Sequence, residues 1–270
     1  VPAHVLPLIH PRASVTTVHD LGFLRHPEAH TPSQRRYLRW STGWSARGSR
    51  LVIADSITTR QDLIDSYAID AGKVRVVYLG RDENLTPVTD EEQLIAVRRR
   101  YGIDGAYLLY VGTIQPRKNL ARIIEAFAAI ASEPAARELR LVLAGKPGWL
   151  YDDLSGIVER HGLAGRVLFP GYVDAGDLPA LLSGATAFVF PSLYEGFGLP
   201  VIEAQSCGAP VMTSNNSSLP EIAGDSALLV DPHDVHAIAA AMRRLLEDAD
   251  LRDELRCRGF ENVKRFSWEK

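Results

Sequence analysis

Short apolar runs alternate with helical patterns along the whole chain. In the first third, three runs at 14–22, 50–56 and 74–80 are rich in β-branched residues and apolar on both faces. Such runs are typical of parallel strands that are buried on both sides. The segments between them, 33–49 and 56–68, carry the spacing of helices, and Ser56 or Thr58 is expected to cap the second one. The order β-α-β-α-β predicts about half of a doubly wound domain.

A polar segment with a proline and several acids follows at 81–93, and this composition predicts a linker between domains. After a short helix at 91–101 the alternation starts afresh. It predicts strands at 106–112, 139–145, 166–172, 186–192, 209–214 and 226–231, and helices at 119–131, 151–162, 175–185, 199–208 and 235–248, with a further helical pattern at 249–266. Six strands with helices between them predict a complete doubly wound α/β domain.

Composition narrows the class of protein. The net charge of −3 does not favour nucleic-acid binding, and the arginine run at 98–100 is interpreted as a solvated helix face. Cys207 and Cys257 show neither a CxxC motif nor metal-ligand spacing, which indicates a reduced, cytoplasmic protein without disulfides. No apolar run approaches the roughly 18 residues that span a bilayer, and no secretory signal begins the chain.

Ligands of open α/β sheets bind at the carboxyl ends of the strands, and four such ends carry candidate chemistry. In the first, YVGTIQPRKNL, Gly112 ends a strand and Arg117 and Lys118 occupy the loop before a helix that Asn119 could cap. Two cations beside a helix N-terminus predict a diphosphate clamp. The alternative is that both are solvated loop residues.

The second candidate is VFPSLYEGFGLPVIEA. Gly196 and Gly198 allow a ligand to approach the backbone closely, and Pro200 fits a first helical turn. Glu195 in the loop and Glu203 in the helix place two carboxylates beside an anion site, which predicts a ligand with both phosphate and sugar. Alternatively, Glu203 only complements its helix dipole and Glu195 is a turn residue.

The remaining candidates are weaker. Tyr172 and Val173 end the strand at 166–172, where a flat base could lie against them, although ordinary packing would explain them too. His19, followed by Asp20, ends the first strand and is a candidate polar group at the reacting centre, although a packed or surface histidine is the alternative. The sequence contains no GxGxxG after a strand, no P-loop and no GxSxG, so nicotinamide, P-loop and nucleophile-elbow sites are not supported.

At this point the residues resemble a family. EGFGLPVIEA, with seven residues between Glu195 and Glu203, resembles the E-x7-E motif of retaining GT-B glycosyltransferases of family 4. GTIQPRKNL resembles their diphosphate loop, and the stretches from FPGYVDAGD to LVDP resemble the rest of their donor domain. VTTVHDLGFLRHP, VIADSITTRQDLI and VRVVYLG resemble the second half of their acceptor domain, and FSWEK the start of a helix that crosses back to it.

The resemblance implies roles for these positions. Arg117 and Lys118, with Gly112 and Thr113 beside them, would hold the donor's diphosphate. Glu195 and the N–H groups of Phe197, Gly198 and Leu199 would bind sugar and phosphate, and Glu203 would bind the ribose hydroxyls. Tyr172 and Val173 would flank the base, and His19 would lie near the anomeric carbon. The resemblance implies no cofactor and no metal, because cationic side chains and the helix dipole take over that work.

Two departures from the family pattern stand out. Thr113 occupies a position where many relatives have an arginine, so a weaker or rearranged clamp is expected. The opening strand and glycine-rich loop of the acceptor domain are absent, so we expect a partial acceptor domain at 1–83, a donor domain at 84–262 and the start of the crossing helix at 263–270. The predicted fold is therefore α/β GT-B, two Rossmann-like domains with the first incomplete.

The predicted function is that of a retaining glycosyltransferase of polysaccharide biosynthesis. It would move a hexose, mannose from GDP-mannose by resemblance, to a glycan or lipid-linked acceptor; whether this stretch alone is active stays open, because the first part of the acceptor domain is missing from it. The site would lie in the cytoplasm, at the inner face of the membrane if the missing first part makes a peripheral contact. The alternatives are a glycoside hydrolase that uses Glu195 and Glu203 as its acid and nucleophile, and a nucleotide-sugar epimerase or binding protein on a GT-B scaffold.

Overall fold

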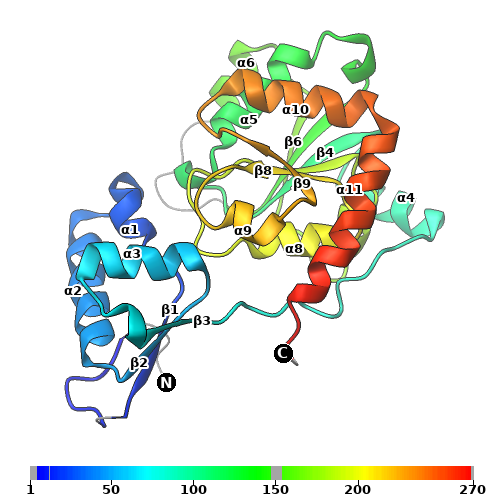
Figure 1. The fold of residues 1–270 in the computed structure, drawn as a ribbon. Helices are drawn as coiled ribbons and strands as arrows, with labels where there is room; N and C mark the ends of the chain where they lie inside the picture. Colours follow the sequence, from blue (N-terminus) through cyan, green and yellow to red (C-terminus); the bar gives the residue numbers. More distant parts are fainter. Residues whose placement is uncertain (1–4, 12, 147–153, 269–270) are drawn as a thin grey trace.

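Two parallel β-sheets organise the chain (Figure 1). The computed structural model describes residues 5–11, 13–146 and 154–268. The first sheet has the order β1-β2-β3 and the second the order β6-β5-β4-β7-β8-β9, with all pairings parallel. The predicted α/β class with two parallel sheets is confirmed.

The first sheet follows the predicted β-α-β-α-β order. Its strands are β1 (Val15–Val18), β2 (Leu51–Ala54) and β3 (Val74–Val76), and its helices are α1 (Gly22–Arg25), α2 (Pro32–Gly48) and α3 (Ile57–Tyr67), with 3-10 turns η1 (Pro27–Ala29) and η2 (Ala71–Lys73). Thr31 and Gln34 form a capping box that starts α2. Ser56 caps α3 by accepting the N–H of Thr59, which confirms one of the two predicted caps.

The second sheet has the strand order of a doubly wound nucleotide-binding domain. Its strands are β4 (Tyr107–Val111), β5 (Arg140–Ala144), β6 (Val167–Gly171), β7 (Ala187–Phe190), β8 (Val211–Ser214) and β9 (Ala227–Val230). The central strands β7 and β8 are buried along their whole length, as their continuous apolar runs predicted. The chain reverses its direction of winding between β4 and β7, so the ligand crevice is expected at the carboxyl ends of these two strands.

Helices cover both faces of this sheet. They are α4 (Glu91–Arg100), α5 (Leu120–Ile130), α6 (Leu154–Arg160), α7 (Leu178–Ser183), α8 (Leu199–Ser206), α9 (Leu219–Ala223), α10 (Val235–Glu247) and α11 (Ala249–Asn262), with turns η3 (Pro116–Lys118), η4 (Pro134–Ala136) and η5 (Val263–Arg265). α5, α6 and α10 lie on one face and α8, α9 and α11 on the other (Figure 1). The beginning of the helix predicted at 151–162 lies outside the described residues.

The structure corrects one predicted cap. Asn119 precedes α5, but its side chain accepts no hydrogen bond from the backbone N–H groups at the start of the helix. Its backbone is left-handed, with φ of 66°, and its amide donates to the carbonyls of Pro191 and Pro232 at 2.9 and 2.7 Å. The asparagine therefore ties the loop after β4 to neighbouring loops instead of capping the helix.

The two domains meet at an apolar junction around the linker. Phe197, Phe266 and Tyr78 form an aromatic group with ring centroids 5.7 to 6.0 Å apart. The N–H of Arg81 in the linker donates to the carbonyl of Phe266 at 2.9 Å. The indole of Trp268 lies on Gly80, where a Cβ atom would come within 2.5 Å of its ring. The tail that follows α11 is thus packed against the linker.

Candidate functional site

The loops after β4 and β7 meet where the sheet order predicts a ligand crevice. The first loop carries Arg117 and Lys118, and the second carries Glu195. The N–H of Leu193 donates to the carbonyl of Arg117 at 2.9 Å and joins the loops through their backbones. Three candidate residues from two separate loops of the sequence are therefore neighbours.

These three residues form a buried charge cluster. Lys118 Nζ lies 2.6 Å from Glu195 Oε1, and Arg117 Nη1 lies 3.0 Å from Glu195 Oε2. Lys118 is 8% exposed and Glu195 is 7% exposed, so both charges are shielded from bulk water. The ammonium of Lys118 also lies 4.9 Å from the centre of the Phe190 ring, a cation–π distance.

The cluster holds one more positive than negative charge. Burial alone would raise the pKa of Glu195, but Lys118 and Arg117 outweigh it and the pKa is lowered, so the carboxylate stays ionised. Burial, together with the nearby charge of Arg117, lowers the pKa of Lys118 against the pull of Glu195. Burial opposes the charge of Arg117 too, but Glu195 and Asp20 raise its pKa. The surplus positive charge favours an anionic ligand.

The loop that carries Glu195 is held in place by hydrogen bonds within the second domain. The hydroxyl of Ser218 donates to the carbonyls of Glu195 and Phe197 at 3.0 and 2.6 Å, and the N–H of Glu195 donates to Ser217. Within the described parts of the chain, the N–H groups of Phe197, Gly198 and Leu199 donate to no protein acceptor. Unpaired N–H groups at the start of a helix, here α8, are suited to an anion.

A cleft of about 400 Å³ separates the two domains in front of this loop. Its walls are His19, Asp20 and Asp55 from the first domain, Leu79 from the stretch after β3, and residues 195–200 from the second domain. His19 Nδ1 lies 2.6 Å from Asp55 Oδ2, and Asp55 is 1% exposed. Since the carboxylate accepts the proton of Nδ1, this contact orients the ring and leaves Nε2 as its second polar atom. His19 and the loop that carries Glu195 thus line the same cleft, and the role of His19 at the reacting centre stays a prediction.

The two domains approach each other closely at Gly196. A Cβ atom there would collide with the carbonyl oxygen of His19 and lie 2.5 Å from Asp20 Cβ. Glycine is therefore required at this position for the observed approach of the domains.

Glu203 lies apart from the charge cluster. It belongs to α8 and does not line the cleft, so the prediction that both glutamates share one crevice finds no direct contact here. Burial and the neighbouring Asp82 of the linker raise the pKa of Glu203. Among the described residues, its carboxylate accepts no hydrogen bond.

The predicted base-binding residues lie at the end of β6. Tyr172 is 59% exposed, and Lys146 Nζ lies 4.4 Å from the centre of its ring. Val173 is buried. Gly112 joins this edge through its N–H, which donates to the carbonyl of Ala144, and the exposed Thr113 accepts the hydroxyl proton of Tyr110 through its carbonyl. These residues follow three adjacent strands, β4, β5 and β6.

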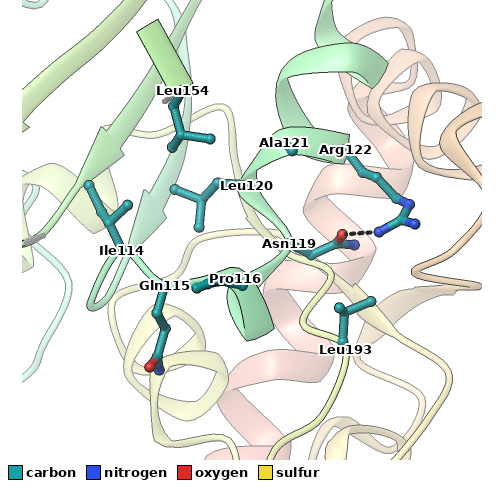
Figure 2. Close-up of a pocket in the computed structure, with 9 residues that line it drawn as sticks. All are labelled: Ile114, Gln115, Pro116, Asn119, Leu120, Ala121, Arg122, Leu154 and Leu193. Carbon is teal, nitrogen blue, oxygen red and sulfur yellow. Dashed lines mark hydrogen bonds between the residues drawn. The ribbon is translucent and has the colours of Figure 1, made fainter. Parts of the chain in front are cut away.

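A second, mostly apolar pocket lies beside the loop after β4 (Figure 2). It measures about 210 Å³, and the side chain of Asn119 in its wall accepts a hydrogen bond from Arg122 at 2.9 Å. Its lining residues are Ile114, Gln115, Pro116, Asn119, Leu120, Ala121, Arg122, Leu154 and Leu193. None of the charged residues of the Glu195 cluster lines this pocket, so we place the site in the interdomain cleft.

Reasoning from the sequence missed residues that touch this site. Asp55 orients His19, and the hydroxyls of Thr59 and Tyr194 hold the Glu195 loop against the first domain through hydrogen bonds. A signal was present for Asp55, because it stands at the carboxyl end of the predicted strand at 50–56. Thr59 and Tyr194 gave no such signal, because their partners come from the other domain.

No group of three or more potential metal ligands occurs in residues 5–11, 13–146 and 154–268. In the same residues, no helix has the length and apolar character needed to cross a membrane.

The sequence was compared with known families and curated proteins. The family described as glycosyl transferases group 1 matches residues 96–261, and glycosyltransferase family 4 matches residues 2–85. The chain is 38% identical over 256 residues to O-antigen chain mannosyltransferase B of Escherichia coli, which covers 95% of the chain and 67% of that protein. It is 31% identical over 264 residues to the serotype-specific mannosyltransferase WbdA of Escherichia coli, covering 96% of the chain and 32% of that protein.

Solved structures resemble the fold over nearly the whole chain. Sucrose-phosphate synthase from Thermosynechococcus elongatus matches with a TM-score of 0.79 and 30% identity, over 94% of this chain and 64% of its own. Anabaena HepE, crystallised with UDP and glucose, matches with a TM-score of 0.80 and 23% identity, over 95% of this chain and 68% of its own. The chain thus spans about two thirds of these two structures and of mannosyltransferase B, and a third of WbdA.

Proposed function

The chain belongs to the glycosyl transferases group 1 family, and from this we propose that it carries the nucleotide-sugar site of a retaining glycosyltransferase. The enzyme transfers a hexose to a glycan or lipid-linked acceptor in polysaccharide biosynthesis. The donor we propose is GDP-mannose, since two relatives bear the name of mannosyltransferases.

One observation carries this proposal: a buried, net positive charge cluster at the switch point of a doubly wound sheet. Arg117 and Lys118 supply two charges, and the free N–H groups at the start of α8 add the positive end of a helix dipole. A diphosphate matches this arrangement in charge and shape. Glu195 then remains as a hydrogen-bond acceptor for the hydroxyl groups of a sugar attached to the diphosphate.

The reaction follows from where charge develops. As the bond from the anomeric carbon to the diphosphate breaks, negative charge grows on the leaving phosphate and positive charge on the sugar ring. Arg117, Lys118 and the N-terminus of α8 stabilise the negative charge on the leaving phosphate. Glu195 stays ionised and binds the hydroxyl groups of the sugar. Its negative charge also stabilises the positive charge that develops on the sugar ring.

The first domain contributes His19. Its Nδ1 is held by Asp55, and its ring lines the cleft in which the sugar and the acceptor would meet. A neutral imidazole in this orientation accepts a hydrogen bond, and a protonated one donates it. Asp55 acts through His19 and is a positioning residue.

The nucleotide occupies the edge formed by β4, β5 and β6. The exposed ring of Tyr172 offers a stacking surface for the base beside Val173, and Glu203 binds the ribose hydroxyls. Its raised pKa fits a carboxylate that lacks a protein donor and gains two hydroxyl donors with the ligand. Acceptor binding falls to the first domain, and the reaction takes place on the cytoplasmic side of the membrane.

A glycoside hydrolase fits the site less well. A hydrolase needs one carboxyl group protonated for the leaving oxygen and a second one across the bond. Here Glu195 is ion-paired to two cations, which favours its ionised form, and Glu203 lies outside the cleft. Neither of these two glutamates matches the required pair.

Binding of nucleotide sugars tests the proposal. A ligand that binds only the folded chain raises its melting temperature by mass action. We expect a rise with GDP-mannose and GDP, a smaller one with UDP and ADP sugars, and the loss of the GDP-mannose increment over GDP in Glu195→Ala. Glu159→Gln, an exposed carboxylate of the same domain, serves as the control. No shift with any nucleotide sugar, or hydrolysis of a nitrophenyl mannoside without nucleotide, would sink the proposal.

A further inference from the structure

A second polar cluster joins the two domains beside the cleft. The hydroxyl of Tyr194, in the second domain, donates to Asp62 Oδ2 of α3 at 2.8 Å. The N–H of Leu21 donates to the same hydroxyl at 3.3 Å, and Arg25 Nε donates to Asp62 Oδ1 at 3.0 Å. Tyr194 is 5% and Asp62 3% exposed, so the contact is sealed from water. The four residues connect elements that lie far apart in the sequence.

Tyr194 serves this contact as a neutral hydrogen-bond donor. Burial and the charge of Asp62 raise its pKa far above the usual range for tyrosine, so its proton stays on the oxygen. The carboxylate of Asp62 accepts from both a phenol and a guanidinium, which satisfies a buried charge. Separating the domains would therefore expose a well-satisfied network.

The same loop is tied to α3 on the other side of Glu195. The hydroxyl of Thr59, buried on α3, lies 3.2 Å from the carbonyl of Gly196 and donates to it. The carbonyl of Tyr194 accepts from Arg117 Nη1 at 2.5 Å. Both neighbours of Glu195 in the sequence are thus held by the first domain, and one of them is also held by the cation that pairs with Glu195.

The geometry points to Tyr194 and Asp62 as positioning residues that couple docking of α3 to the orientation of the sugar-binding carboxylate Glu195. The inference rests on the proposed function for the role of Glu195. When α3 is docked, the loop is held on both sides of Glu195 and presents the carboxylate to the cleft. When α3 is undocked, the loop keeps only its bonds within the second domain, such as those to Ser217 and Ser218.

Two ligand-free measurements test the coupling. The exposed thiol of Cys257 and a second one from Ser66→Cys, exposed at the end of α3, take spin labels, whereas Cys207 is buried with its pKa raised to about 12. Pulsed EPR then reports the distance between the domains. Amide hydrogen exchange of a peptide covering 193–199 reports how firmly the loop is held.

Tyr194→Phe removes the hydroxyl with both of its hydrogen bonds, and Asp62→Asn replaces the charged acceptor by a neutral amide; both keep the shape of the side chain. The docked fraction relative to the open one should fall about tenfold, the scale of a hydrogen bond to a charged group. The distance distribution should lengthen, and exchange in 193–199 should accelerate. Asp65→Asn, an exposed carboxylate of the same helix, should match the parent chain in both measurements. Circular dichroism and exchange in α5 and α10 verify that the variants are folded.

A ligand arm separates this inference from the proposed function. Both variants should weaken the binding of GDP-mannose about tenfold. Their affinity for GDP should stay within twofold of that of the parent chain, because the nucleotide contacts the second domain alone. Unchanged distances and unchanged exchange in Tyr194→Phe would overturn the inference. Longer distances with unchanged exchange would overturn the coupling to the Glu195 loop. If the parent chain binds neither GDP-mannose nor GDP, the proposed function fails, while distance and exchange still decide the coupling.

Discussion

Lys118 Nζ lies 2.6 Å from Glu195 Oε1, and this contact joins the loop after β4 to the loop after β7 at the centre of the site. Arg117 approaches the other oxygen of the same carboxylate at 3.0 Å. The three charges depend on one another, because Lys118 and Glu195 are buried, Arg117 is largely shielded, and each loses hydration that the others replace. Without a ligand, Glu195 is the counterion of the two cations.

We therefore predict unequal effects of removing each charge. Glu195→Gln leaves two buried cations without an anion and should lower the free energy of unfolding by about 3 to 5 kcal/mol. Lys118→Met leaves Glu195 with Arg117 and should cost about 1.5 to 3 kcal/mol. The double variant should cost less than the sum. Urea unfolding measures the free energy of unfolding of all three variants. As a control, Glu254→Gln, which removes an exposed pair with Arg258, should lower this free energy by less than about 1 kcal/mol. Additive effects would contradict a coupled cluster.

The pH dependence of stability follows from Glu195. Its pKa is lower in the folded chain than in the unfolded one, so the unfolded chain binds more protons at acid pH. This contribution is complete above the ordinary glutamate pKa of about 4.3 and is lost as the pH falls through the lowered value. The stability difference between the parent chain and Glu195→Gln should thus be largest at neutral pH and shrink in acid. A difference that grows in acid would refute the ion pair.

Glu203 should behave in the opposite way. Burial and Asp82 raise its pKa, so its ionised form costs stability once the pH exceeds the ordinary glutamate pKa. Glu203→Gln should therefore raise the melting temperature at neutral pH, and the gain should vanish in acid. The same variant should weaken GDP binding about tenfold by losing an ionised acceptor for the ribose. Calorimetry of unfolding and of GDP binding checks both; a neutral-pH loss of stability would refute the burial effect.

Gly196 gives a steric test of the closed arrangement. A methyl group there would collide with His19 and Asp20, so Gly196→Ala should drive the domains apart at a cost of about 1 to 3 kcal/mol. GDP-mannose transfer by the full-length enzyme should fall at least tenfold, whereas GDP binding by the second domain should persist. Gly176→Ala is the matched control, since nothing lies within 4 Å of its added Cβ. Equal transfer rates in both variants would show that this contact is dispensable.

Tyr172 tests the position of the base. Tyr172→Ala should weaken the binding of GDP about tenfold, which is the scale of one stacked base. The affinity of Tyr172→Phe for GDP should stay within twofold of that of the parent chain. The melting temperature should not change in either variant, because the ring is 59% exposed. Isothermal titration with GDP measures the effect. Equal affinities of the alanine variant and the parent would place the base elsewhere.

The predicted family and fold class are confirmed, and the reason is local. Continuous apolar runs predicted β7 and β8, and glycines and charges at strand ends marked the loops that meet at the switch point. Arg117, Lys118 and Glu195 were predicted as parts of one site and do lie in contact. The roles of these residues toward a donor, and the domain boundaries at 83 and 262, stay predictions.

The parts that escaped prediction depend on contacts across the chain. Asn119 has the type and position of a helix cap, but two carbonyls from other loops bind its amide and a left-handed backbone suits that direction. Tyr194 and Asp62 lie 132 positions apart, and no periodicity links them. Glu203 follows Glu195 at the expected spacing, yet its carboxylate lies near Asp82 of the linker, which a motif within one helix cannot reveal.

The tail packed on the linker has a mechanical consequence. Tyr78 packs against Phe266, Trp268 covers Gly80, and the N–H of Arg81 binds the carbonyl of Phe266, so residues 78–81 belong to the second domain as a rigid part. Val77 is still bonded to β2 through its N–H. Between these two anchored stretches, the backbone torsions of Val77 and Tyr78 connect the first domain to the second. Because this connection is so short, a small rotation there displaces Asp62 and His19 of the first domain relative to the second domain.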